Sequence, residues 1–264
     1  MKHPIARTAD FLATLRVERR TIEDIPPELR PPDAASAYAV QDALVERLLA
    51  HYGGRTVGYK IACTNTIAQQ LLNTDAPVFG RLLSSCVHLS PARLKADDFT
   101  IRVMEAEFAF TVARDVPAPD TPYTSGTIAP YIGSMLPAIE IVDHRLADWS
   151  KFDVYCLMAD NAIHGAWVPG AASDTWRGVD LAAHAVHLLV NGQAVEDGSG
   201  AAVLGHPLNA LAWLANELGT WERTLRAGDW VTTGVCTNIY LADAGDHVEA
   251  DFGSLGRAEL TFEA

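Results

Sequence analysis

The residues with the clearest chemical potential are two glutamates inside an apolar stretch. The stretch Ile101–Val112 is dominated by β-branched and aromatic residues and lacks Gly and Pro, which predicts a β-strand. Side chains alternate faces along a strand, so Glu105 and Glu107 point the same way. Two neighbouring carboxylates in apolar surroundings need compensation, and a hard divalent cation supplies it. A strand with one solvated face is the alternative explanation of this pair.

A third acid favours the metal hypothesis. The stretch Met135–Asp143 predicts a second apolar strand, with Glu140 between two isoleucines. Glutamate is disfavoured in strands and costly to bury. Beside Glu105 and Glu107 it completes a set of three carboxylates, which Mg²⁺ or Mn²⁺ binds with room left for water and substrate. The sequence therefore predicts these three glutamates as metal ligands.

Composition and charge exclude several classes of partner. The chain has 264 residues, of which 49% are hydrophobic, enough for a large core. Its net charge is −13 without a basic stripe, which argues against nucleic acid or an anionic membrane as partner. An anionic substrate would need a local cation at the site.

Location follows from similar considerations. No apolar run is long enough for a membrane span, and the N-terminal residues lack the continuous apolar segment of a secretory signal. The four cysteines are widely spaced, which fits free thiols in a reducing compartment. We therefore expect a cytoplasmic protein.

The first quarter of the chain is predicted to be mainly helical. Helices are expected at residues 8–20 and at Ala34–His51, the second capped by Asp33. The strand Arg55–Ala62 follows and carries Lys60 between apolar neighbours. A lysine there can extend its ammonium to the surface. A position beside a metal or an oxyanion is the functional alternative.

The second half is predicted to be mainly β-structure with one good helix. The predicted elements are a hairpin at His187–Glu196 with Asn191-Gly192 at its turn, the helix Pro207–Leu218, and strands at Trp230–Gly234, Val248–Phe252 and Gly256–Phe262. The glycine spacing fits no nucleotide-binding fingerprint, and the sequence has no GxSxG or HExxH motif. These absences argue against a nucleotide cofactor and a serine hydrolase.

Strings distributed along the chain point to a known family. They are GYKI (58–61), EAEFAF (105–110), PAIEIVDHR (137–145), ADNA (159–162), AGDWVTTG (227–234) and AGDHVEADFGSLG (244–256). Together they resemble the fumarylacetoacetate-hydrolase-like superfamily, and within it the branch of 2-keto-4-pentenoate hydratases and 2-oxo-3-hexenedioate decarboxylases.

The resemblance implies a fold and an assembly. The fold would be α+β, a mixed β-roll like the C-terminal part of fumarylacetoacetase, with flanking helices and a small N-terminal helical part. Residues 1–264 would form a single catalytic domain, with a helical subregion at 1–54 and a β-rich metal-binding core at 55–264. Such proteins form homo-oligomers, and a complex with a partner enzyme of the same pathway is also expected.

The resemblance also implies a site. Glu105, Glu107 and Glu140 match the acidic ligands of Mg²⁺ or Mn²⁺, and the small-molecule substrate would be a 2-oxo acid that chelates the metal. Lys60 matches the family lysine near the substrate, and Asp160 and Thr237 match positions that line or support the pocket. We predict Lys60 and Asp160 as catalytic residues, and Thr237, Phe79 and His164 as substrate-binding residues.

Two departures from the family pattern affect the choice of reaction. Hydratases of this branch carry Pro-Asp-aromatic-Gly where this chain has Pro77-Val78-Phe79-Gly80. Val78 weakens the hydratase assignment and is tolerable for a decarboxylase. The usual ADNAS is altered and is followed by His164. His164 could supply a substitute polar group, although we interpret it as an ordinary surface residue.

The predicted activity is that of a divalent-metal-dependent lyase. It would add water to a 2-hydroxy-dienoic acid, as a 2-keto-4-pentenoate hydratase does in aromatic meta-cleavage catabolism. One alternative is 2-oxo-3-hexenedioate (4-oxalocrotonate) decarboxylase. Another is a C–C hydrolase of acylpyruvates, which needs a histidine–glutamate pair that the sequence does not reveal. A third is a non-catalytic partner subunit, against which the three intact carboxylates argue.

Overall fold

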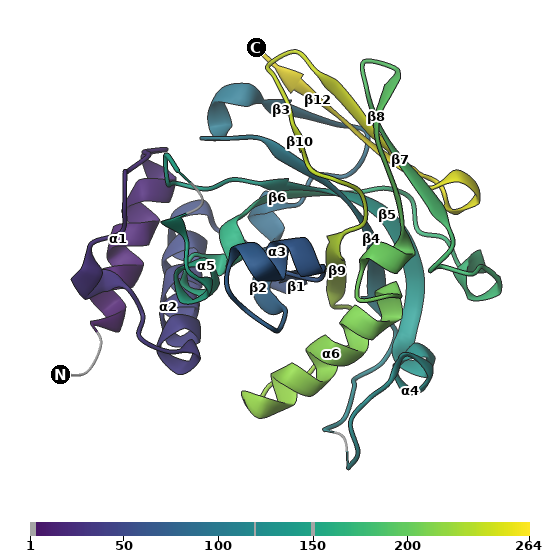
Figure 1. The fold of residues 1–264 in the computed structure, drawn as a ribbon, viewed down its shortest axis with the longest axis horizontal. Coiled ribbons are helices and arrows are strands. Elements are labelled where there is room, and N and C mark those ends of the chain that lie inside the picture. Colours follow the sequence, from purple (N-terminus) through teal and green to yellow (C-terminus); the bar gives the residue numbers. More distant parts are fainter. Residues whose placement is uncertain (1–3, 119, 149–150) are drawn as a thin grey trace.

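Two β-sheets and a flanking group of helices make up the molecule (Figure 1). The computed structural model describes residues 4–118, 120–148 and 151–264. Within these ranges, none of the helices combines the length and the apolar character that crossing a membrane requires. The predicted α+β class, with strands curled into a roll and helices beside it, is confirmed.

The elements follow the predicted order closely. The helices are α1 (Ile5–Val17), α2 (Ala34–Tyr52), α3 (Thr66–Leu71), α4 (Ser125–Ile128), α5 (Val154–Ala159) and α6 (Pro207–Thr220). The strands are β1 (Thr56–Ala62), β2 (Val78–Leu83), β3 (Ala92–Lys95), β4 (Val103–Val112), β5 (Ile132–Val142), β6 (His164–Pro169), β7 (Ala185–Val190), β8 (Gln193–Ser199), β9 (Trp230–Val235), β10 (Tyr240–Leu241), β11 (His247–Asp251) and β12 (Arg257–Glu263). The first helix begins three residues before the predicted start at residue 8.

The seven-stranded sheet curls back on itself. Its order is β2-β1-β9-β4-β5-β6, with β10 beside β4. The chain that leaves β2 then pairs with β6 at the far edge: His88 N donates to Trp167 O at 2.9 Å and Ser90 N to Pro169 O at 3.0 Å. The two edges of the sheet therefore lie close together, and one face of the sheet is enclosed.

The outer face of this sheet packs against the second sheet. That sheet has the order β3-β12-β11-β7-β8. Met104, Ala106, Phe108 and Phe110 of β4 belong to the main core, as the predicted alternation requires, and the ring of Phe108 meets that of Phe252 edge-on at 4.9 Å. The opposite face of β4, which carries Glu105 and Glu107, is the enclosed one.

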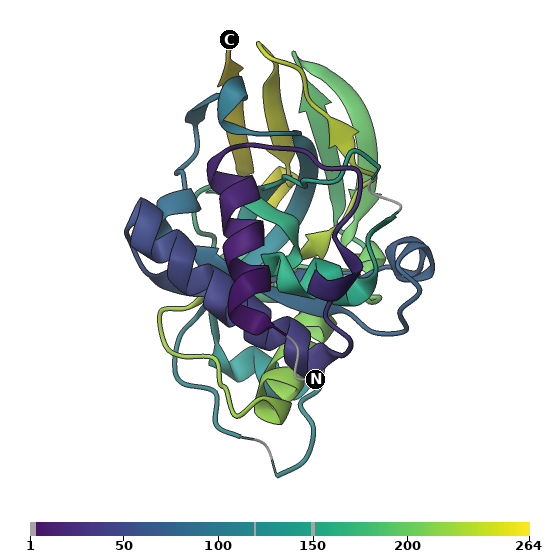
Figure 2. The same ribbon diagram turned by 90° about the vertical axis from the view of Figure 1, so that its left-hand side faces the viewer.

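Helices α1 and α2 lie side by side on one flank of the molecule (Figure 2). Asp33 caps α2 by accepting a hydrogen bond from Ser36 N at 2.7 Å, as predicted. The apolar stripe of α2 is buried and helps to join this helical layer to the sheet. This layer matters for the site because Arg16, near the end of α1, binds Asp160, which directly follows α5 (Val154–Ala159).

Candidate metal centre

Three glutamates meet on the enclosed face of the curled sheet. Strands β4 and β5 run antiparallel, and Glu105 lies directly opposite Glu140. Glu107 follows two residues later on the same face. One carboxylate oxygen from each residue lies within 4.8 Å of the others, and the side chains of Glu107 and Glu140 are fully buried. The predicted grouping of the three carboxylates is thus confirmed, while their role as metal ligands stays a prediction.

Glu107 is held by strand β9. The Thr232 hydroxyl donates to Glu107 Oε2, and the backbone N–H of Gly234 donates to the same oxygen at 3.1 Å. An irregularity in the β4–β9 register adds one residue to β9 between Thr232 and Val235. Such a bulge changes the direction of backbone groups. Gly234 lies in this bulge, and its N–H points at the carboxylate of Glu107. Glu107 Oε1 has no hydrogen-bond partner among the described residues.

Lys60 is buried beside these carboxylates, with a side chain only 1% exposed. Its ammonium nitrogen lies 3.1 Å from Glu140 Oε1 and donates to the carbonyl oxygen of Ala162 at 3.0 Å. Burial alone would lower the pKa of Lys60, but attraction to Glu140, Glu105 and Glu107 outweighs it and raises this pKa. The lysine is therefore charged and does not extend to the surface.

His164 is buried, and its interpretation as a surface residue is wrong. The side chain is 1% exposed, and its Nδ1 lies 2.9 Å from Glu140 Oε1. The reason is a bulge in β6, where Ile141 pairs with Ala166 but Val142 pairs with His164. The additional residue, Gly165, reverses the alternation and turns His164 onto the face that carries Glu140.

The site carries more negative than positive charge. Burial and the neighbouring carboxylates raise the pKa of Glu105 to about 7 and that of Glu107 well above its usual range. Burial acts the same way on Glu140, but Lys60 and His164 outweigh it and lower the pKa of Glu140. Glu107 Oε1 and Glu140 Oε2 are buried without hydrogen-bond partners in the described part of the chain. A divalent cation fits this donor set, because it would pair both oxygens and balance the excess charge.

Asp160 lies in a buried ion-pair cluster rather than among the glutamates. Arg16 Nε donates to its Oδ1 at 2.9 Å, and Arg145 donates to its Oδ2 at 2.5 Å through one terminal nitrogen. Burial raises the pKa of Asp160, but the two arginines outweigh this and hold the pKa below its usual range. Both carboxylate oxygens are therefore committed to arginine, which favours a positioning role over the predicted catalytic one.

The two other predicted substrate-binding residues differ in their placement. Phe79 pairs with Ile61, on the face of β2 opposite to that of Lys60, and its ring stacks on Tyr38 at 4.2 Å in the main core. This placement argues against the predicted contact of Phe79 with substrate. Thr237 follows β9, is half-buried, and donates to Asn238 O at 2.8 Å. Its role in binding stays a prediction.

The sequence analysis missed three contributors to the site. Thr232 reaches Glu107 from a distant strand, and the Ala162 carbonyl reaches Lys60 from a turn. Thr64 is 2% exposed, its hydroxyl has no partner among the described residues, and it packs against Gly234 so closely that a Cβ there would meet Thr64 Oγ1 at 2.1 Å. The long-range pairing of β1, β4 and β9 brings Thr64 and Thr232 to the site, and the turn before β6 brings the Ala162 carbonyl.

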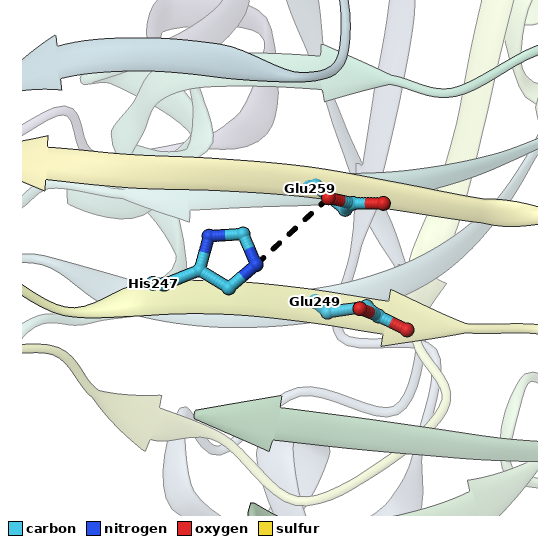
Figure 3. A group of neighbouring side chains, drawn as sticks. All are labelled: His247, Glu249 and Glu259. Carbon is cyan, nitrogen blue, oxygen red and sulfur yellow. Dashed lines mark ion pairs between the residues drawn. The ribbon is translucent and has the colours of Figure 1, made fainter. Parts of the chain in front are cut away.

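A second group of potential ligands lies on the five-stranded sheet. Figure 3 shows His247 and Glu249 on β11 and Glu259 on the neighbouring strand β12. His247 Nε2 lies 3.8 Å from Glu259, while Arg257 pairs with Glu259 at 2.9 Å and with Glu249 at 3.5 Å. The side chains are all partly exposed. Arg257 already balances these carboxylates, so we interpret the group as a surface ion-pair network.

Comparison with known proteins shows which family the chain matches. A family model described as fumarylacetoacetate (FAA) hydrolase C-terminal matches residues 68–263. The chain is 34% identical over 261 residues to a 2-keto-4-pentenoate hydratase of Paraburkholderia phymatum, covering 98% of this chain and 97% of that protein. It is 32% identical over 244 residues to a 2-keto-4-pentenoate hydratase of Paraburkholderia xenovorans, covering 92% and 88%.

A solved structure has the same fold over almost the whole chain. The 4-oxalocrotonate decarboxylase of Pseudomonas putida G7, complexed with magnesium and adipate, superposes with a TM-score of 0.90 at 26% identity and covers 98% of this chain and 97% of its own. The family model spans most of the chain, and the relatives align over nearly its full length. The chain belongs to the fumarylacetoacetate hydrolase family.

Proposed function

We propose that the protein is a divalent-metal-dependent lyase that adds water to a 2-hydroxy-dienoic acid, as 2-keto-4-pentenoate hydratases do. The observation that carries this proposal is the buried set of Glu105, Glu107 and Glu140 beside the charged Lys60. Its support is the family membership and the relatives named 2-keto-4-pentenoate hydratase. The cation is Mg²⁺ or Mn²⁺, in line with the magnesium of the decarboxylase structure.

Glu105, Glu107 and Glu140 would hold the cation. When bound, a divalent cation acts as a Lewis acid that stabilises negative charge on the 2-oxygen of a 2-oxo acid. The cation also cancels the excess negative charge of the site, which lets a carboxylate substrate enter a protein of net charge −13. Each anchored carboxylate keeps one oxygen fixed by the protein and presents the other, so the ligand set is ordered before the metal arrives.

Lys60 and Thr64 are the groups available to the substrate. An ammonium has three N–H donors, and contacts to Glu140 and Ala162 account for two of them among the described residues. The third N–H of Lys60 can donate a hydrogen bond to a substrate oxygen and so keep a proton beside that oxygen. The buried hydroxyl of Thr64 has no other described partner and can orient the same substrate.

Decarboxylation is the second candidate, and Val78 is the observation that favours it. Val78 is fully buried and pairs with Ala62, and Gly80 pairs with Lys60. Val78 therefore lies on the face of the sheet that carries Lys60. An apolar side chain thus occupies the position where hydratases of this branch carry Asp. A carboxylate there would help to place water, while loss of CO₂ needs no such group.

The hydrolase alternative gains one supporting contact. It predicted a histidine–glutamate pair, and His164 pairs with Glu140 at 2.9 Å. The same glutamate oxygen also bonds Lys60, so the pair serves the carboxylate cluster and has little freedom to activate water. Assembly into a homo-oligomer, association with a partner enzyme and a cytoplasmic location stay predictions.

One experiment separates these candidates. The protein is incubated with 2-hydroxypenta-2,4-dienoate or 2-oxo-3-hexenedioate in the presence of Mg²⁺, while ultraviolet absorbance and CO₂ are followed. Loss of absorbance without CO₂ indicates hydration, and release of CO₂ indicates decarboxylation. Inactivity on both substrates would overturn the proposal.

Removing one predicted ligand tests the role of the metal. Glu107→Gln keeps the size of the side chain but removes its charge, and we expect turnover to fall by about 100-fold or more because the donor set loses an anionic oxygen. Circular dichroism should show an intact fold. Full activity of the wild-type protein in a chelator would contradict the metal mechanism.

A further inference from the structure

The turn between α5 and β6 has an uncommon backbone. Asn161, Ala162 and Ile163 have φ values of 54°, 50° and 50°, so three successive residues other than glycine adopt the left-handed region. Side chains with a Cβ disfavour this region, and a β-branched residue such as Ile163 disfavours it most. Such a turn persists only where its surroundings over-determine it, and strain of this kind clusters at functional sites.

The turn supplies two contacts to the glutamate site. The carbonyl oxygen of Ala162 accepts a hydrogen bond from Lys60 Nζ at 3.0 Å. His164, the next residue after the left-handed run, places Nδ1 2.9 Å from Glu140 Oε1. The orientation of Lys60 and of one oxygen of Glu140 therefore depends on the path of this turn.

Arg16 of helix α1 holds the turn from outside. Its guanidinium donates to Asp160 Oδ1 at 2.9 Å, to Asp160 O at 2.6 Å and to His164 O at 2.7 Å. These acceptors stand immediately before and after the left-handed run. The planar guanidinium spans both ends of the turn, which a lysine could not do with the same geometry. The side chain of Arg16 is 11% exposed.

Two further side-chain contacts add to this support, beside the backbone bonds from Ile163 N to Asp160 O at 2.9 Å and from Asp143 N to Ile163 O at 3.0 Å. Arg145 binds the second oxygen of Asp160 at 2.5 Å. The Asn161 side chain accepts a hydrogen bond from Arg81 N at 2.7 Å and donates to Arg81 O at 3.0 Å, which ties the turn to β2. These contacts hold one end or the middle of the turn, whereas Arg16 joins its two ends.

We propose that Arg16 is a positioning residue of the active site, which acts through the turn at 161–163 on Lys60 and Glu140. The inference rests on the proposed function for its kinetic consequence. Glu107 is anchored by β9, so Arg16 acts on Lys60 and on one oxygen of Glu140 and does not act on the anchoring of Glu107. The N-terminal helix is thereby part of the catalytic apparatus.

The test compares Arg16→Gln with Arg19→Gln. Arg19 lies one turn further along the chain, is 51% exposed and pairs with Asp98 at 3.1 Å, so its loss should leave the turn unchanged. For Arg16→Gln we expect kcat to fall by about 10- to 100-fold. KM measured at saturating Mg²⁺ should stay within about threefold of the wild-type value, as expected for an effect on alignment alone.

A measurement on the metal-free protein provides a readout independent of activity. Glu140 Oε1 already accepts from the Lys60 ammonium, so His164 Nδ1 is the donor in its hydrogen bond to the same oxygen. In ¹⁵N-histidine spectra this buried N–H should exchange slowly with solvent, and the spectrum of His164→Gln assigns it. We expect exchange to accelerate at least about tenfold in Arg16→Gln, because the turn opens locally. Arg19→Gln should show wild-type exchange.

A further variant, Arg16→Gly, tests the same role by chemical rescue. A cavity of about 420 Å³ is lined by Arg16, Arg145 and His164, so a small cation can reach the place of the missing side chain. Millimolar guanidinium should restore kcat and slow His164 exchange in Arg16→Gly.

The outcomes separate the inference from the proposed function. Wild-type inactivity on both substrates would overturn the proposed function, while the exchange measurement would still decide the role of Arg16. Wild-type kcat and wild-type His164 exchange in Arg16→Gln would overturn the inference. So would the absence of guanidinium rescue in folded Arg16→Gly.

Discussion

In Glu107 and in Glu140, one carboxylate oxygen is hydrogen-bonded by the protein and the other has no partner among the described residues. Glu140 Oε1 accepts from Lys60 and His164, and Glu107 Oε2 accepts from Thr232 and Gly234. The other oxygen of each residue is buried without a partner in the described ranges. Partners that fix one ligand oxygen strongly influence affinity at metal sites. The anchoring residues should therefore control metal binding as much as the ligands do.

Thr232 and Thr233 provide a matched test of this anchoring. Both are buried; Thr232 donates to Glu107, while Thr233 donates to Phe108 O at 2.8 Å. Thr232→Val should weaken Mg²⁺ binding by about 10- to 100-fold. Thr233→Val removes a buried hydrogen bond of similar worth, about 1 kcal/mol, without changing metal affinity. Calorimetric titration measures both, and equal affinities in the two variants would contradict the anchoring role.

Substitution of Thr64 tests the substrate contact without affecting the predicted metal ligands. Its hydroxyl is buried beside Gly234 and lacks a described partner. Thr64→Val should raise KM for the 2-oxo acid by roughly tenfold, the worth of one hydrogen bond, while Mg²⁺ affinity stays unchanged. Steady-state kinetics decide the matter, and Thr64→Ser should recover most of the loss. An unchanged KM in Thr64→Val would exclude the contact.

At the scale of elements, local pattern predicted most of the strands but not their irregularities. The period of two in 101–112 correctly placed Glu105 and Glu107 together, because β4 is regular through that stretch. His164 was misplaced because the bulge in β6 reverses the alternation, and no local signal distinguishes Gly165 from an ordinary glycine. Thr232 was missed because the antiparallel pairing of β4 with β9 joins residues far apart in the chain.

The bulge at Gly165 can be tested directly. A Cβ at this position would meet Ile141 O at 2.7 Å and Asp143 Cβ at 2.8 Å, so the strand would have to shift. We expect Gly165→Ala to destabilise the fold by about 1–3 kcal/mol and to lower activity through displacement of His164. Gly178→Ala is the control, since nothing lies within 4 Å of its Cβ position. Thermal unfolding and turnover would show the difference, and wild-type behaviour of Gly165→Ala would contradict the role of the bulge.

For the whole molecule, the cluster of acidic groups makes metal binding compete with proton binding. In the metal-free state Glu105 has a pKa of about 7, and the pKa of Glu107 is raised well above its usual range. A carboxyl with a raised pKa holds its proton to higher pH, and a cation must displace that proton in order to bind. Thermal stability alone would not isolate this effect, because burial lowers the pKa of His88, His144 and His206, and these groups oppose it below their ordinary value of 6.5.

The difference between metal-loaded and metal-free protein isolates the carboxylates. The folded metal-free protein binds more protons at Glu105 than the unfolded chain between the ordinary value of 4.5 and about 7, so this group lowers stability as pH rises through that window. Mg²⁺ removes the penalty, and its stabilising effect should therefore grow from pH 6 to pH 8. We expect Mg²⁺ affinity to rise by about tenfold per pH unit for each proton displaced. Calorimetry in buffers of different ionisation enthalpy should detect at least one proton released near pH 6.5. A metal affinity independent of pH, with no proton release, would mean that the glutamates are already ionised and would remove the physical basis of this prediction.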